Sequence, residues 1–181
     1  MRYPDSAAER ADHHLLAALR RRGTDPRVAG AARALSWAGE HGAVWLAAGL
    51  AGACADPGRR GAWLRATTLV GAAHAASMGV KRVVRRPRPV LPDAEPLVRT
   101  AGQHSFPSSH ATSAAAAVVA FGALMPRAPF AAPLPPLAAA MCVSRMVVGV
   151  HYPSDVACGA LLGAVTARLG RNWALRGGRP S

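Results

Sequence analysis

The sequence predicts an all-α protein, a multi-pass membrane helical bundle of about five transmembrane helices with a preceding N-terminal amphipathic helix. Hydrophobic residues make up 51% of the 181 residues and charged residues 17%, and the apolar residues gather in five stretches with few charges. These stretches are rich in alanine and glycine, small residues that let membrane helices pack closely. A soluble alanine-rich bundle is the alternative, and the scarcity of charge inside the stretches disfavours it.

Three parts of the chain are expected: an N-terminal interfacial segment (1–26), a membrane domain (27–170) and a basic C-terminal tail (171–181). A helix is predicted at 5–22, with arginines in its last turn, where they suit the helix dipole. Its apolar face is expected to consist of Ala8, Ala11, Leu15 and Leu19. Such a helix could lie on the membrane surface, and a frayed, solvated tail is the alternative.

Five membrane spans are predicted, at 27–55, 63–80, 110–125, 130–149 and 153–169. The first span needs its whole length, because its strongly apolar part is shorter than the ~20 residues that a crossing requires. Trp63 is expected to anchor the second span at the membrane interface. The proline-rich segment 81–108 is too long for a simple connection and is expected to carry function. Alternating crossings bring both ends of this segment and the link between the last two spans to one membrane face.

The net charge of +13 implies an anionic partner, which could be phosphate, an anionic lipid or nucleic acid. The basic residues lie beside apolar segments without interleaved aromatic residues, so nucleic acid is not expected. The three cysteines form no CxxC pair, and neither a disulfide framework nor a zinc site is predicted. The first 23 residues lack the apolar core of a secretory signal.

His151 and Asp155 are the first candidate catalytic pair. They lie four residues apart at a predicted helix start, where a carboxylate that accepts the Nδ1 hydrogen leaves Nε2 free as a nucleophile. An isolated pair with this spacing would more often be structural. Arg145 changes the balance, because it lies six residues earlier at the same face, where a buried arginine is costly without an anion.

Lys81, Arg88 and Arg145 supply three positive groups at that face. A phosphoryl transition state spreads its charge over three equatorial oxygens, so fixed cations can provide most of the stabilisation. Lys81 is the only lysine of the chain, and Arg88 comes directly before a proline. Arg82, Arg85 and Arg86, which lie between Lys81 and Arg88, are interpreted as solvated charges at the membrane interface.

The turn at Ser108, Ser109 and His110 leads into the third predicted span. A helix N-terminus offers free backbone amides to phosphate, and the two serines add hydroxyl groups. His110 could protonate a leaving oxygen, although a histidine here would by itself more often be a neighbour of the helix cap. Together the residues predict in-line displacement at phosphorus through a phosphohistidine on His151, with His110 as acid and then base. Neither a metal nor a cofactor is expected, because cations carry the charge and no carboxylate cluster is present.

Three patterns resemble the type-2 phosphatidic acid phosphatase superfamily over roughly residues 30–170: KxxxxxxRP from Lys81, PSxH from Pro107 and SRxxxxxHxxxD from Ser144. The resemblance implies a metal-independent lipid phosphatase of the plasma membrane, whose partners are an amphiphilic lipid phosphate and membrane lipids. It assigns phosphate binding to Lys81, Arg88, Ser108, Ser109 and Arg145. It also assigns the catalytic roles, with His151 as nucleophile, Asp155 as its partner and His110 as the acid.

One residue departs from the superfamily pattern, since Ser109 replaces the glycine that is common in the second motif. If that position required a positive φ, serine would be strained there. The superfamily also contains vanadium haloperoxidases, but those proteins are large and soluble, whereas this chain is small and apolar.

Within the superfamily, the stretch Ala34–His41 and the compact five-span layout resemble small actinobacterial phosphatases thought to act on decaprenylphosphoryl-5-phosphoribose, a precursor of cell-wall arabinan. Glu40 and His41 are candidate contacts to the ribose headgroup, because an acidic residue near a span indicates a functional site. A cap, or an interfacial pair with Arg33, is the alternative. His74 is interpreted as a packed, hydrogen-bonded core histidine.

Other substrates and one other class of function stay open on the sequence. A polyprenyl diphosphate, phosphatidic acid or phosphatidylglycerophosphate would suit the same motifs. A membrane lipid-binding scaffold with an inactive site is the non-enzymatic alternative, and the intact motif side chains argue against it.

Overall fold

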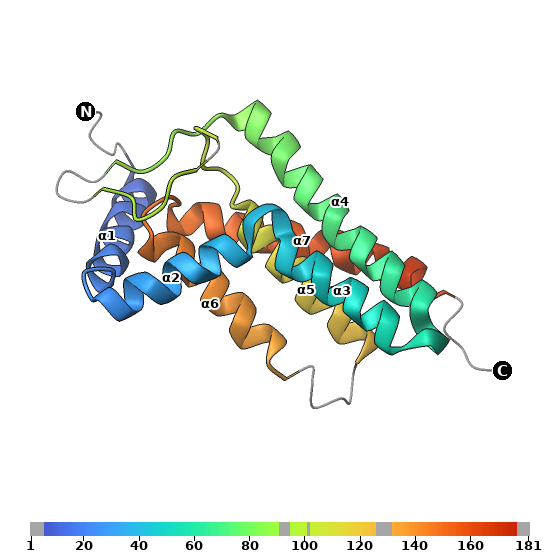
Figure 1. Ribbon diagram of the computed structural model, residues 1–181. Coiled ribbons are helices and arrows are strands. Elements are labelled where there is room, and N and C mark those ends of the chain that lie inside the picture. The colour runs from blue at the N-terminus through green and yellow to red at the C-terminus, as the bar shows by residue number, and fades with distance from the viewer. Residues whose placement is uncertain (1–5, 91–94, 101, 126–131, 177–181) are drawn as a thin grey trace.

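The computed structural model describes residues 6–90, 95–100, 102–125 and 132–176. These residues form an elongated bundle of α-helices, with the N-terminal helix lying across one end (Figure 1). The helices are α1 (Ala7–Arg22), α2 (Pro26–Ala38), α3 (Ala43–Ala55), α4 (Arg60–Val84), α5 (Ser109–Leu124), α6 (Leu134–Val147) and α7 (Pro153–Leu175). The predicted all-α class is confirmed for these ranges. The first five and last five residues and the predicted turn at 126–129 lie outside them.

The first predicted span is not one helix. A short 3₁₀ helix, η1 (Glu40–Gly42), separates α2 from α3, and two consecutive residues in it have positive φ angles, 52° at His41 and 73° at Gly42. Left-handed residues interrupt the ladder of i to i−4 hydrogen bonds, so the chain turns here. The prediction of a continuous helix over 27–55 is therefore wrong. The break places Glu40 and His41 on a corner beside α5.

The expected transmembrane helices are not confirmed in the described ranges, because no helix there combines the length and the apolar character needed to cross a membrane. The helices α3, α5 and α6 have 13, 16 and 14 residues, so they are short for a crossing. The helices α4 and α7 are longer, with 25 and 23 residues, but polar residues interrupt their apolar character. Seven α-helices in these ranges also exceed the number predicted.

The core surrounds α5, whose alanines pack against α4 and α7. Trp63 is buried, and its ring lies 5.5 Å from that of Phe121, so the prediction that Trp63 is an interfacial anchor is wrong. The helices α5 and α7 approach so closely that a β-carbon added at Gly163 would lie 2.0 Å from the Thr112 carbonyl oxygen. Nearer the start of α7, a β-carbon at Gly159 would lie 2.5 Å from the Ser108 carbonyl oxygen, and this close approach brings the second and third sequence motifs together.

The N-terminal helix α1 packs against α6 and α7 through a different face from the one predicted. Its buried residues are Asp12, Leu16 and Arg20, whereas Leu15 is half exposed. Ser6 and Glu9 form a capping box at its start, as the pattern S-x-x-E favours. At its end, Arg20 donates from Nη2 to the Glu95 carbonyl oxygen at 2.6 Å. Both polar and apolar residues therefore hold α1 against the bundle.

Candidate active site

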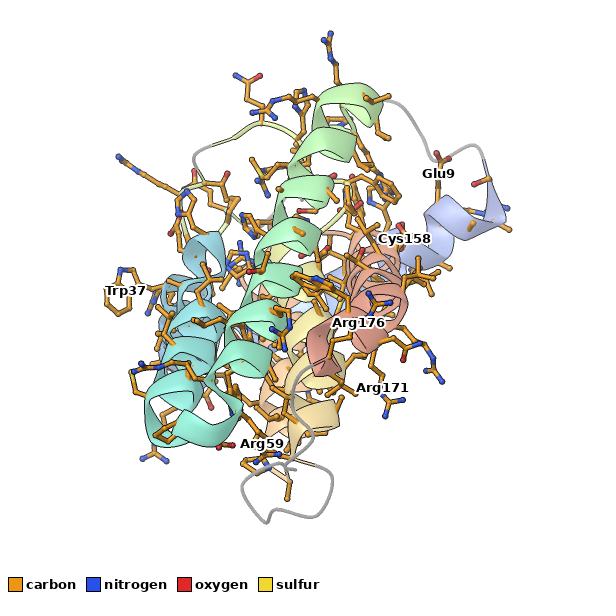
Figure 2. The ribbon with its side chains drawn as sticks, turned by 90° about the vertical axis from the view of Figure 1, so that its right-hand side faces the viewer. Glu9, Trp37, Arg59, Cys158, Arg171 and Arg176 are labelled. Carbon is orange, nitrogen blue, oxygen red and sulfur yellow. The ribbon has the colours of Figure 1, made fainter. Side chains whose placement is uncertain are left out.

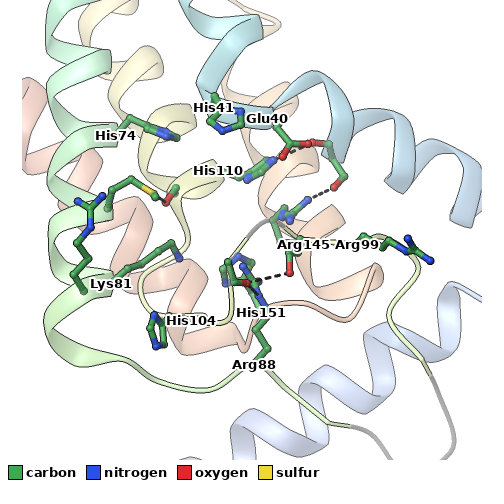
Figure 3. A pocket seen from close by; sticks show the side chains of 16 residues that line it. Glu40, His41, His74, Lys81, Arg88, Arg99, His104, His110, Arg145 and His151 are labelled. Carbon is green, nitrogen blue, oxygen red and sulfur yellow. Dashed lines mark hydrogen bonds between the residues drawn. The ribbon is translucent and has the colours of Figure 1, made fainter.

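A cavity of about 210 Å³ lies where η1, the end of α4, the start of α5 and the end of α6 meet under the segment that follows α4 (Figure 3). Most of the candidate site residues line it, although they come from distant parts of the sequence. They are Glu40, His41, Lys81, Arg88, Ser109, His110, Arg145 and His151. The structure thus brings the three sequence motifs to one cavity.

Two candidate residues, Ser108 and Asp155, lie behind the cavity wall and do not line it. Ser108 is fully buried and caps α5, since its hydroxyl accepts from the Ala111 amide at 3.5 Å. Its own amide donates to the Asp155 backbone oxygen at 2.9 Å. The side chain of Ser108 therefore holds the helix start, and any contact to phosphate in this turn falls to the residues that line the cavity.

His151 lines the cavity, and Asp155 faces it from behind the cavity wall. His151 Nδ1 lies 3.5 Å from Asp155 Oδ2, a contact longer than a charge-assisted hydrogen bond. The same carboxylate oxygen accepts from the Tyr152 amide at 2.8 Å, which fixes its position. Burial lowers the pKa of His151 to about 4, and the adjacent carboxylate only partly offsets that effect. At neutral pH the imidazole is uncharged, as a nucleophile requires.

His110 is held by the backbone of α2. Its Nε2 lies 2.9 Å from the Ser36 carbonyl oxygen, which can only accept a hydrogen bond. In the neutral ring the proton therefore sits on Nε2, and Nδ1 carries the free lone pair. This arrangement leaves Nδ1 as the nitrogen of His110 that can gain and lose a proton.

The three candidate phosphate-binding cations are held by neutral acceptors. Lys81 Nζ donates to the carbonyl oxygens of Ser105 at 3.0 Å and Pro107 at 2.6 Å. Arg88 donates from Nε to the Gly102 oxygen at 2.8 Å and from Nη1 to the Val150 oxygen at 2.9 Å. Carbonyl groups fix the direction of a cation without cancelling its charge.

Arg145 is the most deeply buried of these cations, with 3% of its surface exposed. It donates from Nη1 to the Ser36 hydroxyl, and its Nε has no hydrogen-bond partner. Within the described part of the chain, neither Arg145 nor Lys81 nor Arg88 forms an ion pair with a carboxylate. The three cations of the cavity therefore keep their charge without a paired carboxylate among the described residues, which suits the binding of an anion.

Two residues that contact the candidate site residues were not found by sequence reasoning. Ser36 holds His110 with its carbonyl group and Arg145 with its hydroxyl, and only its place as a polar residue in an apolar stretch could have indicated it. Arg86 was interpreted as solvated, which is wrong, because it forms ion pairs with Asp12 and Asp155. No local pattern marks those partners, which are far away in the sequence.

The contacts of the remaining polar residues of the cavity can be compared with their predicted roles. His74 Nδ1 and the Ser113 hydroxyl are hydrogen-bonded at 2.9 Å. The prediction of a hydrogen-bonded histidine is therefore confirmed, and His74 also lines the cavity. Ser109 receives a hydrogen bond from the Ser77 hydroxyl at 2.8 Å. Glu40 lines the cavity, and no ion pair between it and Arg33 is found among the described residues. Those residues also contain no cluster of His, Cys, Asp and Glu that could hold a metal ion.

The comparison with known families decides what kind of protein this is. The PAP2 superfamily profile matches residues 62–179. The chain belongs to the PAP2 superfamily. This PAP2 chain is therefore a phosphatase, a phosphoric monoester hydrolase that acts on lipid phosphates, and the resemblance of its three motifs is confirmed.

Relatives of this PAP2 chain have names that are more specific. It is 47% identical over 134 residues to the decaprenylphosphoryl-5-phosphoribose phosphatase of Mycolicibacterium smegmatis, covering 74% of this chain and 72% of that protein. It is also 47% identical over 145 residues to the enzyme of the same name from Mycobacterium tuberculosis, covering 80% of this chain and 79% of that protein. The crystal structure of a transmembrane PAP2 type phosphatidylglycerolphosphate phosphatase from Bacillus subtilis shares the fold, with a TM-score of 0.71 at 22% identity over 93% of this chain and 86% of that one.

Proposed function

We propose that this PAP2 phosphatase removes the terminal phosphate of decaprenylphosphoryl-5-phosphoribose in the synthesis of arabinan precursors for the cell wall. The observation that carries the proposal is the cavity, in which His110 and His151 lie together with Lys81, Arg88 and Arg145. The two relatives at 47% identity support this choice of substrate, because they carry that substrate in their names.

In the first step, the imidazole of His151 attacks the terminal phosphorus. Asp155 faces Nδ1 and stabilises the charge that develops on the ring, so Nε2 is the attacking nitrogen. A bond forms between Nε2 and phosphorus while the bond from phosphorus to the ribose oxygen breaks. His110, protonated at Nδ1, gives its proton to the leaving oxygen, and the Ser36 carbonyl keeps the ring in place through Nε2.

In the second step, water attacks the phosphohistidine. His110 takes a proton from the water at Nδ1, the new bond from oxygen to phosphorus forms, and the bond from phosphorus to His151 Nε2 breaks. Inorganic phosphate then leaves the cavity. The cations Lys81, Arg88 and Arg145 contact the equatorial oxygens in both steps, so neither a metal nor a cofactor is called for.

The charge distribution of the cavity favours a terminal monoester over an internal diester. A monoester presents three free oxygens to the three cations, whereas a diester places sugar or lipid where the cavity offers charge. The products are therefore decaprenylphosphoryl-ribose and phosphate, and the lipid linkage stays intact. Glu40 and His41 line the same cavity and are the candidate contacts to the ribose hydroxyls.

We place the protein in the plasma membrane as a multi-pass protein, with the lipid tail of the substrate in the bilayer. Large apolar side chains on its surface support this placement. On α7, Leu161, Val165 and Leu169 follow at intervals of four residues and are 65%, 45% and 82% exposed. Trp37 is 81% exposed and points away from the bundle (Figure 2). Lipid would cover such side chains without cost.

A substrate panel tests the proposal. The purified protein in detergent is supplied with decaprenylphosphoryl-5-phosphoribose, phosphatidic acid, phosphatidylglycerophosphate and decaprenyl diphosphate, and phosphate release is measured for each. We expect the highest kcat/KM with the ribose lipid and phosphate on His151 after acid quenching. Rapid hydrolysis of decaprenyl diphosphate without activity on the ribose lipid would assign carrier recycling instead. No release from any of the four would favour an inactive lipid-binding scaffold.

A variant and a chelator test the mechanism separately from the substrate. We expect His151→Ala to lose turnover on every lipid and to carry no phosphate after quenching. Activity should persist in EDTA. Normal turnover by His151→Ala, or a loss on chelation that magnesium restores, would contradict the phosphohistidine mechanism whichever lipid proves to be the best substrate.

A further inference from the structure

Arg86 connects three parts of the molecule at a point just behind the cavity. It comes from the segment after α4, donates from Nη1 to Asp155 Oδ1 at 2.7 Å, and donates from Nη2 to Asp12 Oδ2 at 3.0 Å. Asp12 belongs to α1 and Asp155 to α7. The guanidinium also lies 4.1 Å from the centre of the Tyr152 ring, within the range of a cation–π contact. One side chain thus links the N-terminal helix to the catalytic aspartate.

Asp12 also fixes the start of α7 directly. It is almost fully buried, its Oδ1 accepts from the Ser154 amide at 2.9 Å, and its Oδ2 accepts from the Ser154 hydroxyl. The Ser154 amide is one of the first-turn amides that have no partner inside their own helix. A carboxylate from another helix therefore acts here as a cap, at the turn that carries Asp155.

The ion pair of Arg86 with Asp155 differs from the contacts of the other site cations. The Asp155 side chain is fully buried and that of Arg86 is 25% exposed, so water screens the pair only weakly. Lys81, Arg88 and Arg145 contact neutral acceptors and line the cavity, whereas Arg86 contacts carboxylates and does not line it. Arg86 is therefore not available to bind phosphate.

The two oxygens of Asp155 have separate partners. Arg86 holds Oδ1, and Oδ2 faces both the Tyr152 amide and His151 Nδ1. Rotation of the carboxylate would break the contact with Arg86, so the ion pair and the Tyr152 amide together fix the oxygen that faces the nucleophile. Without Arg86, the Tyr152 amide alone would hold the carboxylate, and the oxygen that faces His151 would be placed less firmly.

We propose that Arg86, held in place by Asp12 of the N-terminal helix, is a positioning residue for the reaction, because it fixes the Asp155 carboxylate that orients His151. The inference rests on the proposed roles of Asp155 and His151. In this proposal α1 contributes to the geometry of the site through Asp12, in addition to the three motifs that line or adjoin the cavity.

Kinetics of purified full-length variants on phosphatidic acid test this inference. We expect Arg86→Gln to lower kcat roughly tenfold to a hundredfold while KM stays within about twofold of wild type, because misplacement slows the chemistry and leaves phosphate binding intact. Asp12→Asn should lower kcat in the same way by a smaller factor. Arg86→Lys should restore only part of the activity, since an ammonium group cannot reproduce the planar fork that holds two carboxylates.

Arg85→Gln is the matched control. It removes the same charge from the neighbouring residue, which is exposed and whose Nε donates to the Arg82 carbonyl oxygen, its one partner among the described residues, so kcat should not change. Wild-type kcat in both Arg86→Gln and Asp12→Asn, or an effect on KM alone, would overturn the inference. If circular dichroism shows that Arg86→Gln does not fold, Asp12→Asn decides. His151→Ala separates the two levels, since an active His151→Ala defeats the proposed mechanism, whereas an inactive one beside active Arg86 and Asp12 variants defeats only this inference.

Discussion

Gly39 lies directly against His110: a β-carbon at Gly39 would be 2.7 Å from the Cδ2 atom of the imidazole. Gly39 ends α2, and His110 lies in the first turn of α5, where its Nε2 contacts the Ser36 carbonyl. The absence of a side chain at one position therefore allows the proposed acid to reach the backbone of another helix. This relationship gives the first prediction.

Gly39→Ala is expected to lower kcat by roughly tenfold or more, because the new methyl group must displace a ring that the mechanism needs in a fixed position. The Met141 side chain, which also lies within 3 Å, is flexible and can move, but the ring cannot move without losing the Ser36 contact. Gly30→Ala, inside α2, is the control, since nothing lies within 4 Å of its β-carbon. Equal kcat values in the two variants would contradict this role of Gly39.

Gly163→Ala is expected to destabilise the protein by roughly 1–3 kcal/mol or more, because the added methyl group overlaps the Thr112 backbone, which cannot move independently of α5. Gly122→Ala should be neutral or stabilising, since nothing lies within 4 Å of its β-carbon and alanine favours a helix. Melting temperatures in one detergent measure both effects. A Gly163→Ala protein as stable as the Gly122→Ala protein would show that α5 and α7 can separate freely.

The stability of the fold is expected to depend on pH through His151. The pKa of His151 is lowered to about 4 by burial, below the value near 6.5 of an exposed histidine. Between these values the unfolded chain binds a proton that the folded chain does not, so the contribution is present above pH 6.5 and is lost as the pH falls towards 4. Thermal melting at pH 7 and pH 5 should therefore show a drop that is smaller in His151→Ala. An identical drop in both proteins would assign it to other groups.

Glu40→Gln is expected to lose roughly tenfold to a hundredfold in kcat/KM on the ribose lipid and to keep its activity on phosphatidic acid, because one hydrogen bond to the sugar is worth about 1–3 kcal/mol. The ratio of the two rates is the measured quantity. Arg33→Gln is the control for the alternative in which Glu40 pairs with Arg33 at the interface. A parallel loss on both lipids would place Glu40 in the general machinery and not in recognition of the sugar.

The sequence predicted the helical class and the components of the cavity, because both depend on local signals. Apolar stretches between glycine and proline residues mark the helices, and the spacing of His151 and Asp155 places both residues at the start of α7. The three motif cations also line one cavity. The number and order of the helices place the three motif segments at one end of the bundle, so the sequence could predict that these cations lie together.

Features that depend on contacts between distant residues could not be predicted. The break at His41 needs positive φ angles that a glycine in an apolar run does not by itself indicate. The buried face of α1 is set by α6, α7 and the ion pair of Asp12, so polar residues occupy positions where an amphipathic pattern expects apolar ones. Arg86 stands among similar arginines, and only its two acidic partners distinguish it.

The carbonyl groups that hold Lys81 and Arg88 have a consequence for how the enzyme completes its cycle. Three like charges with neutral partners repel one another, so a dianion bound among them relieves this repulsion. Inorganic phosphate does so as well as the substrate does, and folding and product binding become linked equilibria. We therefore expect inorganic phosphate both to inhibit the protein and to raise its melting temperature, so that stability and product inhibition rise together.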